Sequence, residues 1–178
     1  MLNVENFIRM SDVDFVIRKM RKRDIPQVQK VAQLSWYSTY TGIIPMRIQK
    51  NFLKKVYSRK ALKTRLKETI VYVAEIDEAI VGFANYSDVS VAGQTELGAL
   101  YLHPDYQGQG IGTAFLRLAF SELNAKEIHL TVEKNNEKGR KFYAAKGFQI
   151  VTEYENMLEN HVLEIIHLML SEETGKHL

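Results

Sequence analysis

The sequence predicts an α+β protein that contains one parallel βαβ unit. Three observations lead to this prediction. Apolar runs rich in β-branched residues alternate with helical segments along the chain. Two such runs flank the short polar turn Asp77-Glu78, as in a β-hairpin. The segment 96–133 has the pattern strand, helix, strand, and a helical crossover of this kind joins two parallel strands.

The first expected elements are a strand and a long helix. Residues 14–20 have the character of a strand. Asp24 is then expected to open a helix that runs to about Ser38. Pro26 falls in the first turn, and Gln27 follows Asp24 by three residues, as a capping box prefers. The pattern therefore predicts Asp24 as the cap of this helix.

The middle of the chain is expected to be an interrupted helical region followed by the hairpin. Gly42 and Pro45 mark the interruption, because both residues break regular helices. The elements expected after it are, in order, a second helical stretch, a charged helix over 58–68, hairpin strands over 69–75 and 79–86, and a polar loop over 87–95.

The C-terminal half continues to alternate between strands and helices. Its expected elements are a strand over 96–102, a helix over 110–124, a strand over 126–133, a helix over 137–146 that ends at Gly147, strands over 148–155 and 162–170, and a frayed tail over 171–178. The strand over 126–133 alternates apolar residues with His129 and Thr131, so these two side chains are expected to face away from the core.

Composition limits the class of protein. With 178 residues, 46% of them hydrophobic and 25% charged, the chain fits a single domain spanning 1–178, with a core over about 14–170 and short flexible ends. The net charge of +3 does not indicate a nucleic-acid binder, because the basic residues fit solvated helix faces.

The same composition argues against several kinds of site. Cysteine is absent, which excludes disulfides, and 1–10 lacks the pattern of a signal peptide, so a cytoplasmic protein is expected. No apolar run approaches the roughly 20 residues that a membrane span needs. The five histidines show no metal-binding pair. Neither a metal nor a membrane is therefore expected as a partner.

Three glycines precede the helix over 110–124. Gly108, Gly110 and Gly112 leave successive backbone N–H groups uncovered by side chains, in front of a helix N-terminus, which is typical of an anion site. A P-loop is excluded because no Lys-Ser/Thr pair follows. A dinucleotide fingerprint, in which Thr113 replaces the third glycine, and a turn without a ligand remain as alternatives.

The arrangement Gln107-x-x-Gly110-x-Gly112, followed by a helix, a strand, Asn136 and "FYAAKGF" (142–148), resembles the GCN5-related N-acetyltransferase (GNAT) family. The resemblance covers about residues 14–170. It implies the GNAT fold, a mixed twisted sheet of about six or seven strands with helices on both faces, splayed between the fourth and fifth strands. It also implies that acetyl-CoA lies in the split, with CoA as a product.

The resemblance further implies which residues contact the cofactor. Backbone amides of the glycine loop would hold the pyrophosphate, while the strand edge before the loop would pair with the pantetheine arm. The cofactor residues implied in this way are Leu100, Tyr101, Leu102, Gln107, Gly108, Gln109, Gly110, Ile111, Gly112, Thr113, Asn136 and Tyr143.

Two catalytic roles follow from the same resemblance. Tyr143 resembles the tyrosine that protonates the departing thiolate as a general acid, although a core aromatic beside Phe142 is the alternative. Glu96 resembles the general-base glutamate of histone-type members, with Glu133 as second choice and a surface glutamate as the alternative.

The segment "SWYSTYTGIIP" (35–45) resembles a bacterial subgroup that includes polyamine acetyltransferases. Its Trp36, Tyr37 and Tyr40 could offer cation–π faces to an ammonium group, or could pack the helix against the sheet. The expected reaction is direct attack of a primary amine, such as spermidine or spermine, on acetyl-CoA in a ternary complex. A protein N-terminal acetyltransferase and a non-catalytic acyl-CoA-binding module are the alternatives, and a homodimer is left open.

Overall fold

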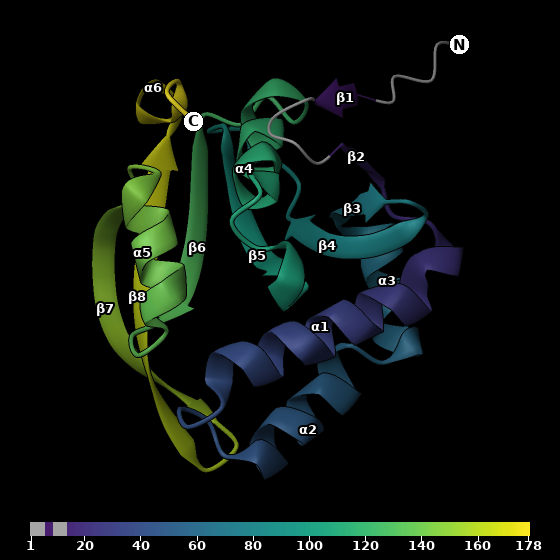
Figure 1. Cartoon of the computed structure of the whole chain (residues 1–178). Helices are drawn as coiled ribbons and strands as arrows, with labels where there is room; N and C mark the ends of the chain where they lie inside the picture. The colour runs from purple at the N-terminus through teal and green to yellow at the C-terminus, as the bar shows by residue number, and fades with distance from the viewer. Residues whose placement is uncertain (1–5, 9–13) are drawn as a thin grey trace.

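The computed structural model describes residues 6–8 and 14–178, which form one mixed sheet flanked by helices (Figure 1). Across the sheet the strand order is β1-β2-β3-β4-β5-β6-β8-β7. The strands are β1 (Asn6–Ile8), β2 (Phe15–Lys19), β3 (Ile70–Ile76), β4 (Ala79–Tyr86), β5 (Gln94–Leu102), β6 (Glu127–Glu133), β7 (Gln149–Leu158) and β8 (His161–Ser171). The α-helices are α1 (Ile25–Tyr40), α2 (Met46–Val56), α3 (Arg59–Glu68), α4 (Ile111–Ser121), α5 (Glu137–Ala145) and α6 (Glu172–Gly175).

The sheet is split between β5 and β6. These strands run parallel and pair only at their first residues, Gln94 with Glu127, Thr95 with Ile128 and Glu96 with His129. Beyond these pairs the strands diverge, as Figure 1 shows. The predicted α+β class, the parallel unit and the position of the splay are thus confirmed. Strand β1, which pairs antiparallel with β2, was not foreseen.

Helices cover both faces of the sheet, and each face has its own hydrophobic cluster. One cluster joins α4 to the sheet and includes Phe115 of α4, Ile128 of β6 and Leu168 of β8. The other lies under α1, α2 and α3 and includes Trp36 of α1 and Phe83 of β4. Successive residues of β3 alternate between the two clusters, because the side chains of a strand point to opposite faces.

The local chemistry of the turns agrees with the sequence. Asp77 and Glu78 both have positive φ, 46° and 65°, and they connect β3 to β4 in a two-residue hairpin. Gly147 follows the C-terminus of α5 and has φ 86°, the left-handed conformation expected of it. The predicted helices and strands are present, with ends shifted by a few residues.

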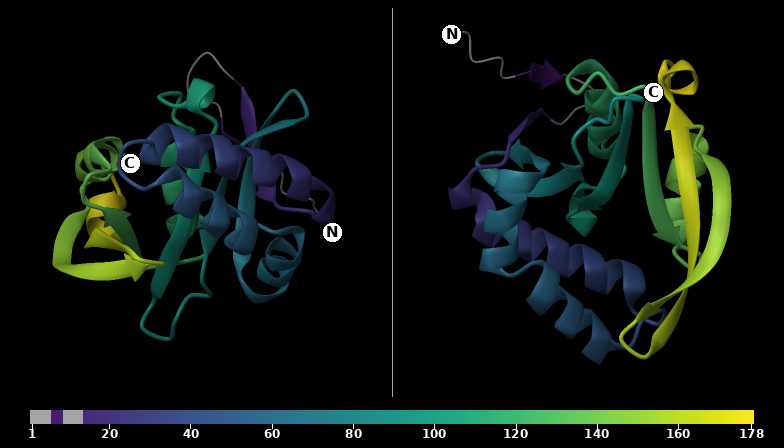
Figure 2. Two further views of the ribbon diagram at one scale, coloured as in Figure 1. Left: turned by 90° about the horizontal axis from the view of Figure 1, so that it is seen from below. Right: turned by 180° about the vertical axis from the view of Figure 1, so that it is seen from behind.

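The tip of the β7–β8 hairpin contacts the α1–α2 region, as Figure 2 shows from behind. Arg47 Nη1 lies 3.0 Å from Glu159 Oε2. Asn51 Nδ2 donates to Glu159 Oε1 at 2.9 Å. His161 Nε2 lies 3.1 Å from the carbonyl oxygen of Ile43. The β7–β8 hairpin therefore contacts the helical layer of α1 and α2 at the open end of the split.

Asp24 stands at the N-cap position of α1, as predicted, but the expected capping hydrogen bond of its side chain is missing. Asp24 belongs to a short 3₁₀ turn, and its side chain makes no cap hydrogen bond to α1. Arg18 Nη1 instead donates to Asp24 Oδ2 at 2.7 Å, and the N–H of Arg21 donates to the same oxygen at 2.7 Å. Gln27 accepts from the N–H of Ile80 at 2.8 Å. The sequence pattern predicted the start of α1 correctly, but the carboxylate of Asp24 binds the guanidinium of Arg18 in β2.

Asp24→Ala should lower the free energy of unfolding by about 3 kcal/mol, because it breaks a buried ion pair. The Asp24 and Arg18 side chains are only 4% and 12% exposed. Burial raises the pKa of Asp24, but hydrogen bonds from Arg18 and Arg21 outweigh it, so the pKa lies below its ordinary value. The stabilisation is therefore complete above about pH 4 and is lost as the pH falls through the lowered value.

Urea unfolding at pH 7 and pH 3 measures this effect. Glu75→Gln is the matched control, because Glu75 pairs with the same guanidinium but its side chain is 27% exposed. A loss for Asp24→Ala no larger than that of the control would contradict the assignment.

The ends of the chain differ from expectation in one respect. The tail over 171–178 was predicted to be frayed, but Ser171 caps the short helix α6 by accepting from the N–H of Thr174 at 3.3 Å. Gly175 packs so tightly that a Cβ there would lie 2.6 Å from the ring of Phe120. That prediction is wrong. The N-terminal flexible end falls on 1–5 and 9–13, outside the described residues.

Candidate active site

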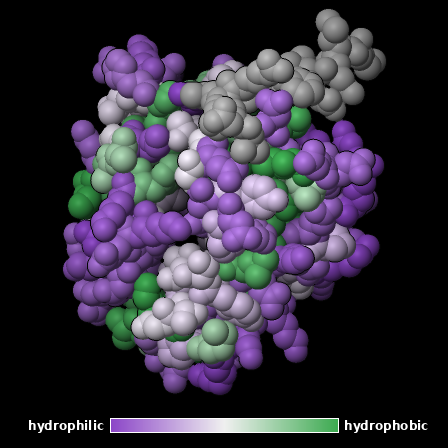
Figure 3. All heavy atoms as spheres, viewed as in Figure 1, coloured by the Kyte–Doolittle hydropathy of each residue, from purple (hydrophilic) through white to green (hydrophobic). Residues whose placement is uncertain are grey.

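A cavity of about 540 Å³ occupies the split between β5 and β6. The surface is hollowed there, between α5 and the β5–α4 segment (Figure 3). The cavity reaches both faces of the sheet, since its walls come from α1 on one side and from α4 and α5 on the other. The lining residues outside the predicted sites are Ser35, Thr39, Leu97, Gly98, Ala99, Thr131, Val132, Lys138, Gly139, Phe142, Ala145 and Lys146.

The glycine loop forms the wall at the N-terminus of α4. Gly108 and Gly110 have φ of 79° and 81°, a conformation that favours glycine. The N–H of Ala114 bonds to the carbonyl of Gly110 at 2.9 Å, so the N–H groups of 111–113 precede the hydrogen-bonded part of the helix. Open amides at a positive helix end suit an anion, and they need no lysine from the loop itself.

Most of the predicted cofactor residues meet at this cavity. Those that line it are Leu100, Tyr101, Leu102, Gln107, Gly108, Gly110, Gly112, Thr113, Asn136 and Tyr143. Gln109 and Ile111 do not. The side chain of Ile111 is fully buried in the core, and the Gln109 amide donates to the carbonyl of Asp105 at 3.3 Å.

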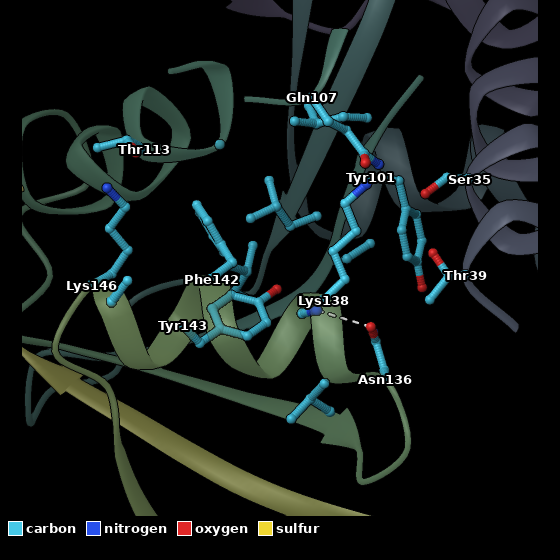
Figure 4. A pocket seen from close by; sticks show the side chains of 18 of the residues that line it. Ser35, Thr39, Tyr101, Gln107, Thr113, Asn136, Lys138, Phe142, Tyr143 and Lys146 are labelled. Atoms are coloured by element: carbon cyan, nitrogen blue, oxygen red, sulfur yellow. Dashed lines mark hydrogen bonds between the residues drawn. The ribbon is translucent and has the colours of Figure 1, made fainter. Parts of the chain in front are cut away.

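Tyr143 lies in the middle of the cavity wall, with its hydroxyl directed into the space (Figure 4). Its ring packs edge-on against Phe142 and Phe148, each with centroids 5.2 Å away. Burial, and to a lesser degree Tyr101, raises the pKa of Tyr143 above the usual phenol value. The hydroxyl therefore keeps its proton throughout the neutral range and can donate a hydrogen bond.

Asn136 is held by the helix that it begins. Its Oδ1 accepts from the N–H of Gly139 at 2.9 Å, which caps α5. The residue also lines the cavity, so capping fixes its position in the wall. Gln107 directs its amide into the cavity beside Tyr101, and its Oε1 is buried without a hydrogen-bond partner among the described residues (Figure 4).

The three aromatic residues predicted to bind the acceptor do not lie together. The ring of Trp36 stacks on Phe52 with centroids 4.2 Å apart and tilts against Tyr40 at 4.6 Å, so this buried indole packs α1 onto α2. Tyr37 does not line the cavity, whereas Tyr40 does. Burial raises the pKa of Tyr40, so it too is a neutral hydroxyl at the α1 side.

Neither carboxylate predicted as a general base lines the cavity. Glu96 is exposed and sits where β5 and β6 are still paired. Glu133 is buried, and its carboxylate accepts from the N–H of Asn135 at 2.7 Å and from Asn135 Nδ2 at 3.0 Å. The geometry gives Glu96 no contact with the space beside Tyr143.

Two lysines, Lys138 in α5 and Lys146 directly after it, were not predicted from the sequence. Lys138 and Lys146 line the cavity, and no carboxylate does so among the described residues. In Figure 4 the ammonium of Lys146 points toward Thr113 at the start of α4. The sequence does indicate them, because Lys138, Phe142 and Lys146 are each four residues apart, a spacing that places them on one helix face. The end of the cavity near α4 therefore combines amides, a helix dipole and a cation.

No helix in the described part of the chain is long and apolar enough to cross a membrane. Within 6–8 and 14–178, no three side chains of histidine, aspartate or glutamate are grouped in a way that could hold a metal ion.

Comparison with known proteins gives consistent results. Residues 67–150 match the acetyltransferase (GNAT) domain family. The chain is 29% identical over 143 residues to a spermidine N(1)-acetyltransferase of Thermoplasma acidophilum, an alignment that covers 75% of this chain and 88% of that protein.

Two solved structures share the fold. A PaiA N-acetyltransferase from Thermoplasma acidophilum in complex with coenzyme A has a TM-score of 0.73 and 26% identity, over 89% of this chain and 98% of that one. A spermidine N-acetyltransferase from Vibrio cholerae in complex with CoA and spermine has a TM-score of 0.68 at 15% identity, over 90% and 97%. The family match over residues 67–150, the split sheet and the glycine loop agree with the predicted resemblance to the GNAT acetyltransferases, enzymes whose acetyl donor is acetyl-CoA.

Proposed function

We propose that this protein transfers the acetyl group of acetyl-CoA to a primary amine, with a polyamine such as spermidine or spermine as the acceptor. The observation that supports the reaction is the cavity through the split, with an anion cradle at its α4 end and neutral hydroxyls at its α1 end. The relative of Thermoplasma acidophilum, named for spermidine, supports the acceptor class.

The α4 end of the cavity fits the donor. The amides of 108–113 and the ammonium of Lys146 would hold the pyrophosphate, since both favour negative charge. The edge of β5 from Leu100 to Leu102 is unpaired on the side of the split and would bond the pantetheine arm as an added strand. Bound in this way, acetyl-CoA supplies a thioester in the narrow part of the split.

Tyr143 would act on the departing sulfur. Its hydroxyl keeps its proton because burial raises its pKa, and it points into the cavity. Donation of that proton stabilises the negative charge that develops as the carbon–sulfur bond breaks, a contribution of typically ~10² to 10⁴-fold. The reaction is direct attack by the amine nitrogen in a ternary complex, with Tyr143 as the general acid.

The acceptor would enter from the α1 side. Tyr40, Ser35, Thr39 and Thr131 line that end of the cavity. Their hydroxyls can accept hydrogen bonds from an amine, and the ring of Tyr40 offers a cation–π face to a second ammonium group.

Release of free thiol from acetyl-CoA tests this proposal. The amines are spermidine, spermine, a short diamine, an aminoglycoside and a peptide with a free N-terminus. We expect release with the two polyamines. Release with the peptide alone would replace the proposal with an N-terminal acetyltransferase, and tight acetyl-CoA binding without release on any amine would favour the non-catalytic module.

A further inference from the structure

The face of β6 and β8 turned toward the α1 side carries two histidines. In β6, Ile128, Leu130 and Val132 enter the core under α4 and α5, so His129 and Thr131 point to the other face. In β8, Ile166 and Leu168 enter the same core, so His167 shares the face of His129. Leu163 lies on the same face of β8, four residues before His167, and it packs on the cluster under α1 to α3.

These histidines belong to a continuous chain of hydrogen bonds. His129 Nδ1 lies 3.1 Å from His167 Nε2. His129 Nε2 lies 3.0 Å from Glu127 Oε2. Gln94 Nε2 donates to the same oxygen at 2.9 Å. The side chains of His167 in β8 and of His129 and Glu127 in β6 therefore form one hydrogen-bonded row.

The proton positions in the chain follow from its acidic end. Hydrogen bonds from His129 and Gln94 lower the pKa of Glu127, so this carboxylate is ionised and only accepts. His129 must then carry its proton on Nε2, which leaves Nδ1 as an acceptor. His167 must donate from Nε2, and its Nδ1 keeps a free lone pair. The resting chain thus ends in one basic nitrogen, His167 Nδ1.

The His167 end of the chain lies beside a residue that lines the cavity. His167 is the cross-strand partner of Thr131, and Thr131 lines the cavity on its α1 side. Neither Glu96, the base expected from the sequence, nor His167 is itself among the lining residues, but the partner of His167, Thr131, is. An acceptor amine with a pKa near ~10 is almost entirely protonated at pH 7 and must lose a proton before it can attack.

We propose that His167 takes the proton of the acceptor ammonium through a bridging water molecule, and that His129 and Glu127 relay the proton toward the surface. The step rests on the proposed acetyl transfer. The ammonium proton goes to His167 Nδ1, the Nε2 proton of His167 moves to His129 Nδ1, and the Nε2 proton of His129 moves to Glu127. The freed nitrogen lone pair forms the carbon–nitrogen bond as the carbon–sulfur bond breaks.

The second proton of the amine is also accounted for. It leaves the nitrogen as the amide forms and returns to the oxygen of Tyr143, which has given its own proton to the sulfur, so that CoA departs as the thiol. His129 and Glu127 act through His167 and are positioning residues. The other titratable groups on this face are Glu96 of β5, Glu133 of β6, Tyr154 of β7 and His161 of β8.

The test is the pH profile of kcat/KM for the acceptor, measured for the full-length protein and for His167→Gln and His129→Gln. We expect each variant to lose about 10- to 100-fold at pH 7, and the loss to shrink toward pH 9.5, where solvent supplies the neutral amine. Acetyl-CoA affinity should be unchanged. His161→Gln is the matched control, since His161 lies on the same strand outside the chain and should keep the parent profile.

The outcomes separate the two proposals. A parent protein that is active on an amine, with both variants equally active at pH 7, overturns the relay alone. A loss that is the same at every pH also overturns it, because that indicates a structural role. A parent protein that acetylates none of the amines overturns the proposed function, and the relay with it.

Discussion

Replacing Tyr143 with phenylalanine should lower kcat by about 10²-fold or more while the dissociation constant for acetyl-CoA stays within about twofold. The ring makes the packing contacts, with Phe142 and Phe148, and phenylalanine preserves them. Only the hydroxyl directed into the cavity is removed. The departing sulfur would then leave without a proton donor, so the loss should appear in kcat.

The pH dependence of the parent protein adds a second check. Because burial raises the pKa of Tyr143, the protonated donor persists to higher pH than in an ordinary tyrosine. The rate should therefore show no fall from tyrosine ionisation below about pH 10. Steady-state kinetics between pH 6 and 10 would measure it.

Tyr86→Phe is the matched control for this substitution. Tyr86 is also a buried tyrosine, but its hydroxyl donates to the carbonyl of Phe115 at 2.7 Å inside the core. Its loss removes one buried hydrogen bond, so stability should fall by about 1 kcal/mol with kcat unchanged. If Tyr143→Phe keeps the parent kcat, Tyr143 has no part in the chemistry.

Gly108→Val should weaken acetyl-CoA binding by about 10- to 100-fold, the equivalent of one or two charge-assisted hydrogen bonds. A Cβ at Gly108 would meet no other atom within 4 Å, so the protein itself has room for the side chain. The added methyl groups would occupy the approach to the loop amides. Isothermal titration with acetyl-CoA measures the change.

Gly42→Val separates this blocking from backbone strain. Gly42 has φ 85° against 79° at Gly108, and a Cβ there also meets nothing within 4 Å. Gly42 lies in the α1–α2 turn and does not line the cavity. Both variants should lose similar stability, but only Gly108→Val should lose affinity. Equal affinity in the two proteins would show that the loop is not the phosphate cradle.

The sequence predicted those features that are encoded by neighbouring residues. The hairpin at Asp77 and Glu78, the left-handed Gly147 and the glycine loop before α4 each depend on residue type at a short, fixed spacing. The helix spacing that brings Asn136 and Tyr143 to one cavity is local in the same sense.

The errors involve partners that belong to different elements of the fold. The missing cap bond of Asp24 could not be predicted locally, because its partner, Arg18, belongs to β2 and competes with the helix terminus. Glu96 resembled a base by its position in a strand, yet nothing local indicates how far β5 and β6 stay paired before they separate. The relay from His167 to Glu127 joins strands that are neighbours only after folding.

The contacts between Glu159 and the start of α2 have a mechanical consequence. At one end of the split, β5 and β6 are joined by backbone pairs, whereas at the other end the halves are tied by side chains such as Arg47, which is 64% exposed. An exposed ion pair contributes only about 0 to 1 kcal/mol and is weakened by salt. The ion pair is therefore the weaker part of this contact, and Leu158 and Leu163, which pack on the cluster under α1 to α3, add the apolar part that salt does not weaken.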